Sequence, residues 1–144
     1  MMLISTKGRY ALRVLIDLAE HRSDGYIPLK VIARRQEISE KYLESIIKLL
    51  VKAKLLKGLR GKGGGYQLTK EPKQYTVDAV LRLTEESLAP VACLEEGAAV
   101  CPRRTDCRTL SMWQGLDELI HGYLSGITLA DLAKPESCGK DHLS

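Results

Sequence analysis

The sequence predicts a mainly α-helical fold that contains one small β-hairpin. A hydrophobic fraction of 44% is enough for a core, and the absence of Phe makes that core aliphatic. Apolar residues recur at helical spacing along most of the chain, whereas one glycine-rich segment, residues 61–65, lies between two short alternating runs. The length of 144 residues fits one domain with an appendage.

Three helices are expected in the N-terminal third of the chain. Ser5 or Thr6 can cap the first helix, which carries an apolar face over residues 11–19. A short helix and a tight turn at residues 36–39 lead to a third helix, for which Ser39 is a suitable N-cap. Two short helices joined by a tight turn form a helix-turn-helix.

A glycine-tipped β-hairpin is expected directly after these helices. Residues 55–60 and 66–69 read as strands, and the glycines at 61–65 allow a sharp turn and a close approach to another surface. The segment lacks the Gly-Lys-Ser/Thr ending and the following helix of a phosphate-binding P-loop. A hairpin in this place is the wing of a winged helix-turn-helix.

The second half of the chain is expected to form a long helix. Thr76 can cap a fourth helix, and residues 85–105 are irregular. The long helix is predicted from about Asp106 to Gly126, and a capping box at residues 128–131 opens a short last helix. The apolar stripe of the long helix is too long for so small a domain to cover, so we expect it to pack against a second copy of the chain. Packing on its own winged helix is the alternative. The stripe comprises Leu110, Trp113, Leu116, Ile120, Tyr123 and Leu124.

These elements divide the chain into four parts. A winged helix-turn-helix unit spans residues 1–84, a cysteine-containing segment 85–105, a dimerisation helix with a short last helix 106–134, and a tail 135–144. The sequence has neither the features of a signal peptide nor the run of about 20 apolar residues that a membrane span needs. A cytoplasmic location without a membrane partner is therefore expected.

Charge is divided unevenly along the chain. Residues 1–75 hold 16 basic and 7 acidic side chains, a net charge of +9, while residues 76–144 hold 6 and 11, a net charge of −5. Seven Lys and Arg but no acid lie between Glu44 and Glu71. Such concentrated positive charge favours a polyanion, with a solvated basic face or an anionic membrane surface as alternatives. The winged helix-turn-helix around these charges favours nucleic acid, and the aromatic anchors of an interfacial helix are lacking.

Three of the four cysteines, Cys93, Cys101 and Cys107, lie in or beside the irregular segment, with seven and five residues between them. In a cytosolic chain, cysteines are more often metal ligands or redox thiols than structural disulfides. Three thiolates suit an iron–sulfur cluster or zinc. Cys107 is expected at the start of the long helix, where the positive end of the helix dipole favours a thiolate. Thiols without a metal are the alternative.

Several motifs together resemble the Rrf2 family of bacterial transcription regulators. They are Ser-Thr-Lys-Gly-Arg-Tyr-Ala-Leu at residues 5–12, Ser39 with Tyr-Leu-Glu at 42–44, the glycine-rich residues 60–66, and residues 126–132. The resemblance covers about residues 2–133, nearly the whole chain. It implies a homodimeric winged helix-turn-helix that dimerises through the long C-terminal helix and binds palindromic operator DNA.

The resemblance also indicates which residues contact DNA. Base contacts would come from the exposed side of the helix at 39–51, where an acid such as Glu44 can accept a hydrogen bond from cytosine N4. Phosphate contacts would come from the start of the first helix and from the wing. The expected base contacts are Lys41, Tyr42, Glu44, Ser45 and Lys48, and the expected phosphate contacts are Thr6, Lys7, Arg9, Arg60, Lys62 and the backbone amides of Gly63 and Gly64.

Many members of the family bind an iron–sulfur cluster through three cysteines before the dimer helix, whereas another branch regulates cysteine metabolism without a cluster. Cys93, Cys101 and Cys107 are the corresponding ligands here, for a cluster of the 2Fe–2S or 4Fe–4S type. The family's fourth ligands do not carry over, because Leu110 and Arg9 stand at their positions. The candidates that remain are Cys138, His121, an exogenous thiol and water.

The sequence therefore predicts a dimeric transcription regulator, expected to be a repressor, whose operator binding responds to an iron–sulfur cluster or to redox state. A regulator without a cluster, responding to thiol oxidation or a small metabolite, is the alternative. An enzyme is not expected, because no Cys-x-x-Cys, carboxylate pair or nucleophile–His–acid arrangement stands out. The acid-free wing argues against a purely protein-binding module.

Overall fold

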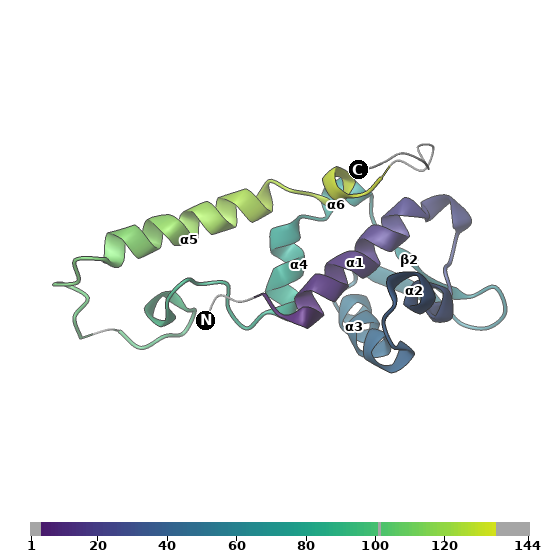
Figure 1. Ribbon diagram of the computed structural model, residues 1–144, viewed down its shortest axis with the longest axis horizontal. Coiled ribbons are helices and arrows are strands. Elements are labelled where there is room, and N and C mark those ends of the chain that lie inside the picture. The colour runs from purple at the N-terminus through teal and green to yellow at the C-terminus, as the bar shows by residue number, and fades with distance from the viewer. Residues whose placement is uncertain (1–3, 101, 135–144) are drawn as a thin grey trace.

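The computed structural model describes residues 4–100 and 102–134, and it shows a winged helix-turn-helix body from which one long helix extends (Figure 1). The predicted mainly α fold with one hairpin is confirmed. The principal elements are α1 Thr6–Glu20, α2 Leu29–Gln36, α3 Glu40–Lys52, β1 Leu56–Leu59, β2 Gly65–Leu68, α4 Val77–Thr84, α5 Leu110–Ser125 and α6 Leu129–Leu132. Short 3-10 turns cover Arg22–Asp24, Pro72–Gln74 and Ala92–Leu94. The predicted tail at 135–144 lies outside the described residues.

Helix α1 is the centre of the body. Ser5, one of the two predicted caps, accepts a hydrogen bond from the backbone N–H of Gly8 at 3.0 Å. The predicted apolar face of α1 is buried, and it packs against α2, α3, α4, α6 and β2. The core is therefore built around one helix, which other elements surround (Figure 1).

The predicted helix-turn-helix is formed by α2 and α3. Glu37 ends α2 in the left-handed conformation with φ 56°, and the side chain of Ile38 is buried in the turn. The hydroxyl of Ser39 then caps α3 by accepting a hydrogen bond from the N–H of Tyr42 at 3.2 Å. One face of α3 is buried, so the opposite face is presented to solvent; the buried residues are Leu43, Ile46, Ile47 and Leu50.

Strands β1 and β2 form the antiparallel hairpin, with Leu59 opposite Gly65. A Cβ atom on Gly64 would lie 2.1 Å from the carbonyl oxygen of Leu59, and one on Gly65 would lie 2.2 Å from that of Ile27. The backbones of Ile27 and Tyr66 approach closely enough to exchange hydrogen bonds of 2.9 and 2.8 Å. The glycines at 64 and 65 are therefore needed to build the wing and to dock it on the body.

Helix α5 begins at Leu110, four residues later than predicted. Residues before it form turns, including one closed by a 3.0 Å hydrogen bond from the N–H of Asp106 to the carbonyl of Arg103. Cys107 therefore lies three residues before the helix and not in its first turn, which corrects the predicted start of α5. Backbone hydrogen bonds from Thr109 and Leu110, at the start of α5, still act on this thiol and help to lower its pKa.

After α5 the chain returns to the body. Thr128 and Asp131 form the predicted capping box, with hydrogen bonds of 2.9 and 3.2 Å. The side chain of Leu129 is fully buried in the main core, and its N–H donates to the carbonyl of Tyr75 at 3.0 Å. The C-terminal end of α5 is thus held at the body while the rest of the helix extends from it (Figure 1). Within the part of the chain that the structure describes, no helix combines the length and apolarity of a membrane span.

Candidate nucleic-acid interface and cysteine segment

The solvent-facing side of α3 carries the residues predicted to contact bases. Lys41, Glu44, Ser45 and Lys48 are exposed, and Tyr42 is half-buried. The hydroxyl of Ser45 donates to the carbonyl of Tyr42 at 2.7 Å, which turns it towards its own helix. The face offers ammonium, carboxylate and phenol groups on neighbouring turns, which is the mixture of donors and acceptors that base edges require.

The start of α1 lies beside this face. The rings of Tyr10 and Tyr42 meet edge to face with their centroids 5.7 Å apart. In the first turns of α1, Thr6 and Arg9 are exposed and Lys7 is half-buried, and the Arg9 guanidinium donates to the Thr6 hydroxyl at 3.1 Å. Two of the three predicted groups of DNA contacts therefore come from adjoining helices.

The third group, at the tip of the wing, is solvent-exposed. Arg60, Lys62 and Gly63 are exposed and Gly64 is half-buried. The N–H of Gly64 donates to the carbonyl of Gly61 at 3.0 Å, which closes the turn. A phosphate contact through Gly64 would therefore share a donor that the turn already uses.

The buried carboxylate of Asp17 lies beneath the helix-turn-helix and was not predicted from the sequence. Asp17 is 2% exposed, and it accepts hydrogen bonds from Nε and Nη2 of Arg35 at 3.0 and 2.6 Å and from Nε2 of Gln36 at 2.8 Å. Its hydrogen bond raises the pKa of the Arg35 guanidinium. The sequence signal was an acid between Val14 and Leu18 on the apolar face of α1. This network fixes the end of α2, and hence the turn into α3.

The cysteine segment (residues 85–105) and the turns that follow it carry two free thiols of intermediate exposure, Cys93 and Cys107. The expected ligands Cys101 and Cys138 lie outside the described residues. Within residues 4–100 and 102–134, no three His, Cys, Asp or Glu side chains are gathered as a metal site. Hydrogen bonding from Thr109, whose hydroxyl lies 3.5 Å from Sγ, lowers the pKa of the Cys107 thiol. The lowered pKa favours the thiolate, which is the form in which cysteine binds a metal.

His121, considered as a fourth ligand, lies where α4 meets α5. Its Nδ1 is 3.1 Å from Oδ2 of Asp78 and 2.9 Å from Nη2 of Arg82. Arg82 also donates from Nε to Asp78 at 2.8 Å. The imidazole therefore contacts both the carboxylate of Asp78 and the guanidinium of Arg82 on α4.

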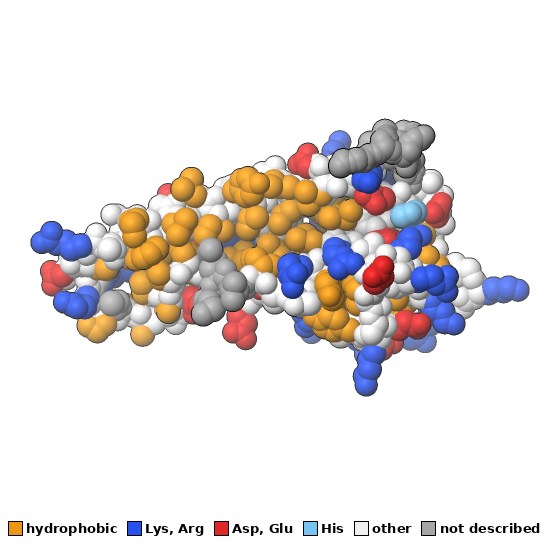
Figure 2. All heavy atoms as spheres, in the orientation of Figure 1, with side chains coloured by type: hydrophobic (Ala, Val, Ile, Leu, Met, Phe, Trp, Pro, Cys, Tyr) orange, Lys and Arg blue, Asp and Glu red, His pale blue; other side chains and the backbone are white. Residues whose placement is uncertain are grey.

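A broad apolar face of α5 is open to solvent. Leu119 is 71% exposed, Tyr123 70% and Met112 54%, and hydrophobic side chains follow much of the helix (Figure 2). Met112 and Leu119 were missing from the predicted stripe, although they lie four and three residues from Leu116 on the same side. Leu124 instead packs against the smaller core cluster of its own chain. The other members of the predicted stripe, Leu110, Trp113, Leu116 and Ile120, are half-buried.

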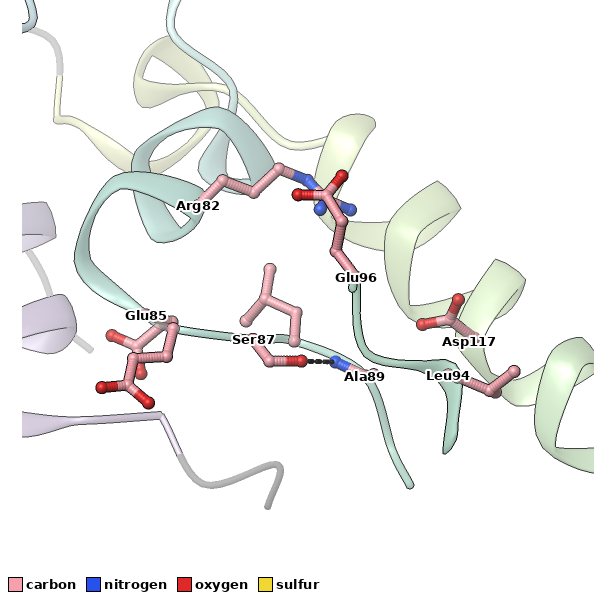
Figure 3. A pocket seen from close by; sticks show the side chains of 9 residues that line it. Arg82, Glu85, Ser87, Ala89, Leu94, Glu96 and Asp117 are labelled. Carbon is pink, nitrogen blue, oxygen red and sulfur yellow. Dashed lines mark hydrogen bonds between the residues drawn. The ribbon is translucent and has the colours of Figure 1, made fainter. Parts of the chain in front are cut away.

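A hollow lies between α4, the cysteine segment and α5, with Glu85 at one end and Asp117 at the other (Figure 3). Glu86 and Glu96 add two more carboxylates, and Arg82 is the basic residue in the lining. This excess of negative charge disfavours a phosphate here. The hollow is therefore unsuited to the DNA backbone.

A family model for Rrf2, described as an iron-dependent transcriptional regulator, matches residues 4–135. The chain belongs to the Rrf2 family. Among curated Rrf2 relatives, the HTH-type transcriptional regulator IscR of Serratia proteamaculans is 40% identical over 131 residues, which cover 91% of this chain and 79% of that protein. IscR of Photobacterium profundum is 38% identical over 92% of this chain and 76% of that protein.

Solved Rrf2 structures share the fold. IscR of T. potens has a TM-score of 0.69 and 38% identity, covering 90% of this chain and 85% of that one. CymR, the global cysteine regulator of B. subtilis, has a TM-score of 0.76 and 36% identity, covering 92% and 97%. The predicted class is confirmed: the chain is a DNA-binding transcriptional regulator of the Rrf2 family and not an enzyme.

Proposed function

We propose that the chain acts as a homodimer that binds palindromic operator DNA and represses transcription by occupying it. The observation that carries this proposal is the contact between Tyr10 and Tyr42, which brings the start of α1, with its candidate phosphate contacts, beside the exposed face of α3. A basic wing on the same body adds a further backbone contact. One protomer then presents base-reading and backbone-binding groups together.

In this arrangement α3 enters the major groove. Glu44 is the acceptor for a cytosine amino group, and Lys41 and Lys48 reach guanine edges or phosphates on either side of it. Thr6, Lys7 and Arg9 hold the backbone next to α3, while Arg60 and Lys62 hold it at the wing. The wing and α1 thereby set the register in which α3 reads bases.

Dimerisation through α5 would present two such surfaces related by a two-fold axis. The exposed side chains of Met112, Leu119 and Tyr123 support this pairing, because a continuous apolar face of this kind marks an interaction surface. A two-fold dimer reads an inverted repeat whose half-sites are one duplex turn or a multiple of it apart. The palindrome thus follows from the symmetry of the pair.

The test is selection of bound duplexes from a random pool, with sedimentation to give the oligomeric state. An inverted repeat bound by a dimer is expected. Glu44→Gln should relax selection at one base pair in each half-site, whereas Lys62→Ala should weaken all sequences alike. Enrichment of no sequence, or of an asymmetric site by a monomer, would contradict the proposal.

An iron–sulfur cluster held by Cys93, Cys101 and Cys107 is our candidate for the sensed group. Three thiols in or beside one segment and the lowered pKa of Cys107 support it, as does the family's description as iron-dependent. When bound, a cluster would supply sensitivity to redox state and iron supply. The chain's own part is to favour the thiolate of Cys107 through Thr109 and to join the segment to both α4 and α5.

A regulator without a cluster is the second candidate, responding to thiol oxidation or a small metabolite. The similarity to CymR, at 36% identity and a TM-score of 0.76, favours it as much as the similarity to IscR favours a cluster. Iron and sulfide analysis of protein purified without oxygen separates the two. Wild type should carry iron and sulfide, and Cys101→Ala should lose them. Iron-free wild type after reconstitution would leave the second candidate, and Cys138→Ala tests the tail as a source of the fourth ligand.

A further inference from the structure

Glu85 links the cysteine segment to the start of α1. It is the first residue after α4, and the chain continues from it to Cys93. Its Oε1 accepts a 2.9 Å hydrogen bond from the N–H of Ser5, and its Oε2 accepts from the hydroxyls of Ser5 at 2.6 Å and Thr84 at 2.8 Å. Two segments 80 residues apart in sequence are joined through one carboxylate.

The first turn of α1 is shaped around this carboxylate. A Cβ atom on Gly8 would lie 2.4 Å from Oε2 of Glu85, so a side chain at this position would displace the acid. The Ser5 hydroxyl, while donating to Glu85, accepts from the N–H of Gly8 at 3.0 Å. A continuous line of hydrogen bonds therefore runs from Glu85 through Ser5 into the helix.

Glu85 also supplies charge that α1 lacks. The first turn of α1 contains no acid of its own, and an anion near a helix N-terminus is stabilising. The donors that Glu85 uses belong to Ser5 and Thr84, which leaves the proposed phosphate contacts at Thr6, Lys7 and Arg9 to DNA. The contacts thus favour support of the DNA-binding turn over competition with a phosphate.

We propose that Glu85 is a positioning residue for DNA binding, which transmits the arrangement of the cysteine segment to the first turn of α1. The proposal rests on the DNA-binding function proposed above. A change in the segment pulls on Glu85, Glu85 moves Ser5, and Ser5 resets the turn that carries Thr6, Lys7 and Arg9. Only a small difference in free energy between two arrangements is needed for such coupling.

The matched variants are Glu85→Gln and Glu86→Gln. Both remove one negative charge at neighbouring positions, but only Glu85 holds Ser5. For binding to a selected duplex, Glu85→Gln should weaken affinity roughly fivefold, the equivalent of losing about one helix cap. Glu86→Gln should leave affinity unchanged or slightly raised. Tighter binding by Glu85→Gln than by Glu86→Gln would overturn the proposal, because it would make Glu85 a competitor of phosphate.

The coupling itself is measured by amide hydrogen exchange in the free protein. Alkylating the cysteines of wild type with N-ethylmaleimide should change exchange at residues 5–9, and the same treatment of Glu85→Gln should not. Ser5→Ala, which removes the partner hydroxyl, should behave like Glu85→Gln. An unchanged exchange rate at residues 5–9 in alkylated wild type would overturn the coupling. Failure of wild type to bind any duplex would instead contradict the proposed function. The hydrogen-exchange experiment needs no DNA, so it would still test the coupling between the cysteine segment and residues 5–9.

Discussion

Asp17 of α1 and Arg35 of α2 form a two-point ion pair, with Nη2 of Arg35 2.6 Å and Nε 3.0 Å from the carboxylate oxygens. The side chain of Asp17 is 1% exposed and that of Arg35 is 31% exposed. Fork-like geometry of this kind fixes orientation as well as distance. The pair therefore sets the angle between the central helix and the helix that leads into α3.

Replacing Asp17 by Asn should destabilise the fold. Loss of the charge leaves Arg35 without its partner, although solvent reaches that side chain and reduces the penalty to about 2 kcal/mol, below the usual range for a fully buried pair. Urea unfolding followed by circular dichroism measures the change. In the double variant with Arg35→Met, the added cost should be small, because the unpaired charge is gone. Equal unfolding midpoints for wild type and Asp17→Asn would contradict this role.

Tyr75→Phe should destabilise the base of the wing. The buried hydroxyl donates to the carbonyl of Leu55 at 2.6 Å and accepts from the N–H groups of Thr69 and Lys70 at 2.9 and 3.2 Å. Removing it leaves these groups without that partner, at a cost of about 1–3 kcal/mol. Thermal unfolding should show a lower midpoint for Tyr75→Phe than for the control Tyr26→Phe. Equal midpoints in the two variants would show that the hydroxyl contributes nothing.

Leu119→Arg should break the proposed dimer. Each subunit would place an unpaired charge in the apolar face of α5, and an uncompensated buried charge costs several kcal/mol. Sedimentation equilibrium should show a monomer at concentrations where wild type is dimeric. Glu118→Arg is the control, because it changes charge on the polar side of the same helix. A normal Leu119→Arg dimer would mean that the subunits meet elsewhere.

The contribution of Glu85 to stability should depend on pH. Burial acts to raise the pKa of its carboxyl, but hydrogen bonds from Ser5 and Thr84 outweigh burial and lower the pKa below the ordinary value of 4.5. A carboxylate whose pKa is lower in the folded state than in the unfolded state stabilises the fold above the unfolded-state pKa. This contribution is lost as the pH falls through the folded-state pKa. The stability difference between wild type and Glu85→Gln should thus be full at pH 7 and shrink below about pH 4.5. A difference that stays constant down to acid pH would contradict an ionic role.

Local patterns predicted most of the fold. Ser39 and Thr128 each carry a capping signal within four residues, and the structure confirms both caps. The network of Asp17 could not be predicted in this way, because its partners lie 18 and 19 residues away. The start of α5 was misplaced for a related reason, since the sequence around Asp106 is compatible with helix and turns close that segment instead.

Only part of the candidate site could be predicted from the sequence. Periodicity placed Lys41, Glu44 and Lys48 on the exposed face of α3, as the structure shows. The predicted stripe omitted Leu119, although this residue lies on the exposed apolar face of α5. The link from Glu85 to Ser5 depends on a contact across 80 residues, which no spacing rule reports.

The salt dependence of binding to the selected duplex is the most direct test of the central claim that this surface binds DNA. Wild type should lose affinity steeply as salt rises, and Arg60→Ala with Lys62→Ala should flatten the log–log slope by about 1.8, roughly 0.9 for each lost phosphate contact. Arg103→Ala with Arg104→Ala removes the same charge from the cysteine segment and should leave the slope unchanged. Identical slopes for wild type and the wing variant, or equal flattening in both double variants, would contradict the assignment of the wing to the DNA backbone.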